Sequence, residues 1–89
     1  MSNEQERPSL LYAFLYNDCI HESSYQTMSL HYSEEGAKDA MVKHKNNAYQ
    51  EFLKYDKFCR ETNKEFYEQF PNKFGEHEDW AVDPVEVLP

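Results

Sequence analysis

The chain has 89 residues, of which 39% are hydrophobic and 16% aromatic, and its 17 acidic and 9 basic residues give a formal net charge of −8. A chain of this length forms one domain with a thin core. The acidic balance argues against binding to nucleic acid or to an anionic membrane, because both require a basic patch.

The surplus negative charge is unevenly distributed along the chain. The segment 33–70 contains 8 acids and 7 bases, whereas the segment 76–86 contains five acids and no base. Such a segment favours a protein partner with a basic surface. The alternative is that the surplus charge only keeps a small protein in solution.

The first nine residues, MSNEQERPS, are polar and predict a flexible leader before a single domain over 10–89. Neither a secretory signal nor a stretch of membrane-spanning length is recognisable. We therefore expect a cytoplasmic protein whose two cysteines, Cys19 and Cys59, are reduced thiols.

Two strands are predicted in the first third of the chain. Residues 10–17, LLYAFLYN, are apolar on both alternating faces, which is typical of a strand covered on both sides. Residues 25–32, YQTMSLHY, alternate between apolar and polar positions. Because a short polar loop joins the two runs, an antiparallel hairpin is the simplest pairing.

A long helix is predicted to begin after Ser33, which is a suitable N-cap and is followed by two acids that favour the start of a helix. It is expected to extend from about 34 to about 60. Its apolar positions recur at spacings of three and four, which defines one helical face. The residues on that face are Ala37, Met41, His44, Ala48, Phe52, Tyr55 and Cys59.

The remainder of the chain predicts a short helix and a last strand. Thr62-Asn63-Lys64-Glu65 fits a capping box and favours a second helix that Pro71 stops, although one long bent helix is the alternative. Residues 80–88 read as a strand that Pro84 confines to an edge or a bulge.

These elements assemble into an α+β fold in the order β-β-α-α-β, with a small, mainly antiparallel three-stranded sheet packed on one long helix. One helix covers one face of the sheet only. The other face, with Tyr12, Phe14, Tyr16 and Tyr25, then needs a cover from the short helix or from another chain. A homodimer through this aromatic face is therefore one expectation.

Candidate chemistry is sparse. Cys19, His21, Cys59 and His77 offer the donor types of a zinc site, but only one half has the short spacing of paired ligands. His44 on the apolar helical face reads as a packed core histidine. No phosphate loop, dinucleotide fingerprint, nucleophile elbow or zinc-protease motif is present. We therefore predict no catalytic residue, no cofactor, no metal and no enzymatic activity.

The chain resembles small uncharacterised domains encoded in phage and bacterial genomes. The likeness rests on the tyrosine-rich strand 10–16, the serine-capped, acid-led helix start at 32–37 and the terminal strand 80–88. The segment 46–74 departs from the shorter helix usual in such domains. The resemblance implies a phage or mobile-element origin, with residence in the host cytoplasm, and brings no active site to carry over.

The sequence thus predicts a non-enzymatic protein that binds and modulates or inhibits a basic protein partner. The alternatives are a homo-oligomeric structural module and a small-ligand or metal-binding domain. We expect acids to steer association and aromatic rings to anchor it. The predicted partner-binding residues are Tyr12, Tyr16, Tyr25, Trp80, Glu76, Glu78, Asp79, Asp83 and Glu86.

Overall fold

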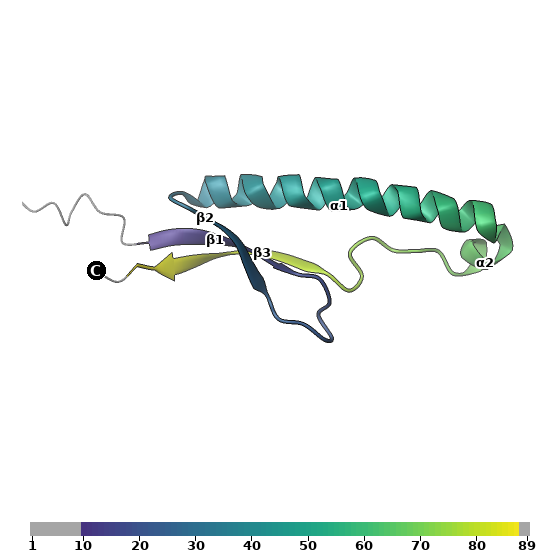
Figure 1. Ribbon diagram of the computed structural model, residues 1–89, viewed down its shortest axis with the longest axis horizontal. Coiled ribbons are helices and arrows are strands. Elements are labelled where there is room, and N and C mark those ends of the chain that lie inside the picture. The colour runs from purple at the N-terminus through teal and green to yellow at the C-terminus, as the bar shows by residue number, and fades with distance from the viewer. Residues whose placement is uncertain (1–9, 88–89) are drawn as a thin grey trace, which may run out of the picture.

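The computed structural model describes residues 10–87 and has the predicted α+β fold. The leader predicted for residues 1–9 lies outside the described residues. The order β-β-α-α-β is confirmed (Figure 1). The elements are β1 (Leu10–Asn17), β2 (Gln26–His31), α1 (Glu34–Thr62), α2 (Lys64–Gln69) and β3 (Asp79–Glu86).

The three strands form one antiparallel sheet in the order β2-β1-β3. β1 and β2 make the predicted hairpin, with a bulge in the pairing between Phe14 and Leu15. β1 and β3 pair along their whole length, from Leu10 opposite Glu86 to Asn17 opposite Asp79. β1 takes the central place because both of its alternating faces are apolar, and β3, which contains Pro84, lies at an edge as predicted.

The start of α1 follows the sequence signal. Ser33 is the N-cap, and its Oγ accepts a hydrogen bond from the Gly36 N–H at 3.0 Å. The helix ends at Thr62, and a short second helix follows after one residue. The cap of α2 is Asn63, whose side chain accepts from the Phe66 N–H at 3.3 Å. The predicted capping box is therefore wrong by one residue, because the Thr62 hydroxyl donates back to the Phe58 carbonyl within α1.

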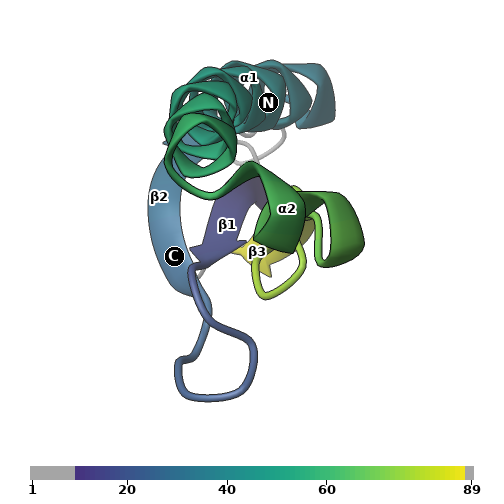
Figure 2. The same ribbon diagram turned by 90° about the vertical axis from the view of Figure 1, so that its right-hand side faces the viewer.

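The face of the sheet that α1 covers is the aromatic one. The rings of Phe14 and Tyr16 lie 5.4 and 4.5 Å from the ring of His44 in α1, and Phe14 is only 3% exposed. The expectation that this face needs a cover from elsewhere is therefore wrong. Figure 2 shows α1 above the sheet and no described helix on the opposite side.

The uncovered face is aliphatic and acidic. Leu11 and Leu15 of β1 lie on it. Val85 of β3 lies opposite Leu11, and Leu30 of β2 lies opposite Ala13, so both also belong to this face. Leu30 is 54% and Val85 39% exposed.

Asp83 pairs with Ala13 and Asp79 with Asn17, so both carboxylates share this face. We call these residues the uncovered face.

α1 continues well beyond the sheet (Figure 1). Its 29 residues span about 44 Å, against about 26 Å for an eight-residue strand. The segment before β3 folds back along the projecting half, where Phe74 packs edge-on against Tyr49 and Phe52 and stacks on Trp80. The core is thin: the buried apolar residues within 10–87 are Ala13, Phe14, Ala37 and Cys59.

Candidate interaction surface

Two segments that are far apart in the sequence meet at one end of the sheet. The residues after β1 and those before β3 are joined by a hydrogen bond from the Ile20 N–H to the His77 carbonyl at 2.8 Å. The rings of His21 and His77 lie 5.5 Å apart. The two joined segments carry five acidic residues, and we call these residues the acidic end: Asp18, Glu22, Glu76, Glu78 and Asp79.

Two tyrosines hold carboxylates of the acidic end in place. The Tyr16 hydroxyl donates a hydrogen bond to Glu78, and the Tyr25 hydroxyl donates to Asp79. Burial raises the pKa of Tyr16, and the hydrogen bond to Glu78 raises it further. The hydrogen bond to Asp79 is the main cause of the raised pKa of Tyr25. Both hydroxyls therefore remain protonated donors at neutral pH.

The predicted aromatic anchors lie on different faces. Tyr25 is 44% exposed and reaches Asp79 on the uncovered face. The register of β1 places Tyr12 and Tyr16 on the face of the sheet that α1 covers. Trp80 lies there too, and its Nε1 donates to Nδ1 of His44 at 3.0 Å. Lys45 extends over the indole ring of Trp80, with Nζ 5.1 Å from the centroid.

The predicted acids do not all gather at one place. Glu76, Glu78 and Asp79 belong to the acidic end, Asp83 lies further along the uncovered face, and Glu86 lies opposite Leu10 at the far end of β3. Asp18 and Glu22 are not among the predicted residues. The only signal for them was their charge, because the pairing of β1 with β3 joins segments about sixty residues apart.

A groove of about 590 Å³ borders the acidic end between α1 and the segment before β3. Phe52 and Tyr55 contribute aromatic surface to it, and Tyr55 is 58% exposed. Three acids, Glu51, Glu76 and Glu78, stand in the lining against one base, Lys73. The groove thus combines apolar surface with an acidic rim.

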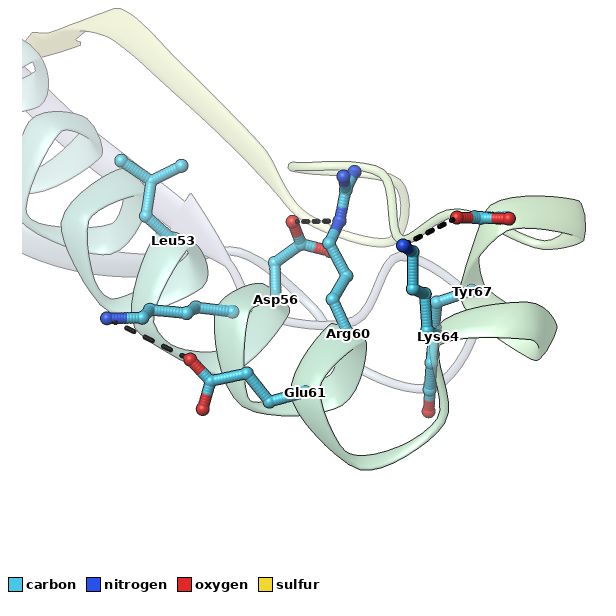
Figure 3. Close-up of a pocket in the computed structure, with 8 residues that line it drawn as sticks. Leu53, Asp56, Arg60, Glu61, Lys64 and Tyr67 are labelled. Atoms are coloured by element: carbon cyan, nitrogen blue, oxygen red, sulfur yellow. Dashed lines mark ion pairs between the residues drawn. The ribbon is translucent and has the colours of Figure 1, made fainter.

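A second cavity, of about 350 Å³, lies where α2 turns back on α1 (Figure 3). Its charged residues form three ion pairs within the lining. These pairs are Arg60–Asp56 at 3.0 Å, Lys57–Glu61 at 3.9 Å and Lys64–Glu68 at 3.9 Å. Because every charge in the lining has a partner of opposite sign there, the cavity offers no uncompensated charge for an ionic ligand.

The sulfur and imidazole groups do not converge. Cys59 is buried in α1, and burial raises the pKa of its thiol, but hydrogen bonds from Tyr67, Tyr55 and Asn72 outweigh burial and hold the pKa below its ordinary value. Of the four candidate zinc ligands, His21 and His77 are in contact. No group of three or more histidine, cysteine or acidic residues within 10–87 is placed to hold a metal ion.

Comparison with known proteins finds no matching family model, no similar curated protein and no similar solved structure. None of the described helices combines the length and the apolar character needed to cross a membrane.

Proposed function

We propose that this chain is a small non-enzymatic protein that binds and modulates a protein partner, and that its acidic end docks on a basic surface of that partner. The observation that supports this is that two distant segments, joined by the hydrogen bond from Ile20 to His77, carry five acidic residues at one end of the sheet. Four of them are exposed, and Glu78 is half-buried. Tyr25, 44% exposed, and the groove lie next to them and offer apolar contact area.

The charge of the helices supports the same role for the acidic end. Along α1 and α2, five acids are paired with bases about one turn away: Glu34, Glu51, Asp56, Glu61 and Glu68. At the acidic end, the pair within reach is His77–Glu76 at 4.0 Å, which attracts only when the histidine is protonated. The negative field is therefore concentrated at one end of the sheet, which steers a basic partner toward that end.

The aromatic residues have different roles in this docking. Tyr25 contacts the partner, because it is exposed and lies beside Asp79. Tyr16 orients Glu78 from beneath α1. Covering a basic functional site of the partner would inhibit it, which fits the phage or mobile-element origin that the sequence resemblance implies.

The experiment is a capture from a bacterial lysate with three versions of the full chain as bait. The test bait carries Asp18→Asn, Glu22→Gln, Glu76→Gln and Asp79→Asn. The control bait neutralises the same number of exposed helical acids: Glu35→Gln, Asp39→Asn, Glu61→Gln and Glu65→Gln.

We expect the wild-type and control baits to retain the same basic protein and the test bait to lose it. Loss from both variants would show that total charge, rather than the acidic end, determines retention. Equal retention by all three baits would refute the proposal outright.

A further inference from the structure

The outer side of β2 is a free sheet edge. β1 is paired on both sides, whereas β2 pairs with β1 alone within residues 10–87. Its outward N–H and C=O groups are therefore open to a further strand. Figure 2 shows β2 at one side of the sheet with no described element beyond it.

The two edges of the sheet differ in their protection. β3 carries Pro84, which lacks an N–H, together with three acids, and both features oppose pairing with another strand. β2 contains no proline, acid, lysine or arginine, and the stretch without these residues extends from Ser23 to Ser33. The bulge interrupts the pairing with β1 near Met28, but Ser29–His31 pair regularly with Tyr12–Phe14.

We propose that β2 pairs with β2 of a second copy of this chain, antiparallel about a two-fold axis near Leu30. The pairing forms a continuous six-stranded sheet. An antiparallel pair of identical edges is self-complementary under two-fold symmetry, because each outward donor meets the same acceptor on both sides. Exposed apolar side chains at this edge lose contact with water: Met28 is 43%, Leu30 54% and Tyr32 83% exposed.

Charge favours a second copy at this edge over any other part of the sheet. Each chain carries a net charge of −8, so two copies repel each other where their acids face. The uncovered face brings Asp79 and Asp83 to any face-to-face contact between copies, whereas the β2 edge brings none. The two-fold axis also places the two acidic ends at opposite ends of the joined sheet.

The symmetry has a further consequence for the layers. A two-fold axis perpendicular to the sheet reverses strand direction and keeps each face on its own side. Both α1 helices therefore cover one side of the six-stranded sheet, and both uncovered faces lie on the other. β3, the protected edge strand, forms both outer edges of the dimer.

The test is the mass of the full chain in solution at high micromolar concentration, measured by light scattering after size exclusion. We expect twice the 10.7 kDa of one chain. Leu30→Glu places two carboxylates opposite each other and should raise the dimer dissociation constant by about tenfold or more. Val85→Glu is the matched control, because Val85 is also exposed on an edge strand and on the same face.

A second variant keeps the test decisive if Leu30→Glu does not fold. Residues directly opposite in an antiparallel pair have Cα atoms about 4.5–5.5 Å apart, within the range of a disulfide. Leu30→Cys should therefore form an intermolecular disulfide on oxidation, and Val85→Cys should not. A monomer at high micromolar concentration, equal dissociation by both glutamate variants, or equal cross-linking by both cysteine variants would overturn the proposal.

Discussion

Trp80 of β3 donates its indole N–H to Nδ1 of His44 in α1 at 3.0 Å. The contact requires that Nδ1 carry no proton, so the imidazole is neutral with its hydrogen on Nε2. The same ring lies against Phe14 and Tyr16 of β1. His44 thus contacts both β1 and β3 from α1, and its hydrogen bond with Trp80 is a polar contact between the helix and the sheet.

His44→Leu should lower the free energy of unfolding by about 1–3 kcal/mol, because the indole N–H of Trp80 loses its acceptor in a half-buried site. His44→Gln retains an acceptor and should cost less. Chemical denaturation followed by circular dichroism measures both. Equal stabilities of the leucine and glutamine variants would show that the hydrogen bond contributes nothing.

The N-cap of α1 gives a second stability prediction. Ser33→Ala removes the acceptor of the Gly36 N–H and should destabilise the protein by about 1 kcal/mol. Ser33→Asp keeps an acceptor and should stay close to the wild type. Thermal unfolding of the three proteins tests this, and an unchanged melting temperature for the alanine variant would contradict the assigned cap.

Tyr16 predicts how stability depends on alkaline pH. Its pKa is raised in the folded state by burial and by Glu78, so above the ordinary tyrosine pKa of about 10 the unfolded chain loses this proton first. The contribution of Tyr16 to the free energy of unfolding is therefore fully present below the ordinary tyrosine pKa, and it is lost as the pH rises above that value. Tyr16→Phe should flatten the decline in unfolding free energy above pH 10 or so. An equally steep decline in both proteins would exclude Tyr16 as its source.

The two thiols should react at different rates with an aromatic disulfide reagent. Cys59 is 4% exposed, whereas Cys19 is half-buried in the loop after β1. The lowered pKa of Cys59 favours its thiolate, but the reagent cannot reach a buried sulfur without local opening. We expect one fast and one slow phase, with Cys19→Ser removing the fast phase. Rapid modification of the Cys19→Ser variant would show that the projecting end of α1 opens readily.

The periodicity of the sequence predicted the elements well. Pro84 predicted that β3 lies at an edge or contains a bulge, and the strand lies at an edge. The choice of the covered face could not be predicted in the same way. Both faces of β1 are apolar, so its alternation is compatible with a helix packed on either face of the sheet. The contact between His44 and Trp80, which selects the covered face, joins residues far apart in the sequence.

The candidate site was predictable only in part. Glu76, Glu78 and Asp79 stood out as a charged run, and the structure brings their segment beside the segment that contains Asp18 and Glu22. The last two were missed because their proximity depends on the register of β1 with β3. The anchoring role expected for Trp80 assumed an open aromatic face, but its ring lies between α1, Phe74 and the sheet.

The most direct measurement is the association rate of the captured partner with the full chain, followed as a function of salt concentration. The wild-type association rate should fall steeply as the salt concentration rises. Asp18→Lys with Asp79→Lys should slow association by an order of magnitude or so at low salt and flatten the salt dependence. The matched control, Asp39→Lys with Glu65→Lys, should keep most of the wild-type rate. Identical rates and salt slopes for the wild type and the acidic-end variant would show that the acidic end does not dock on the partner.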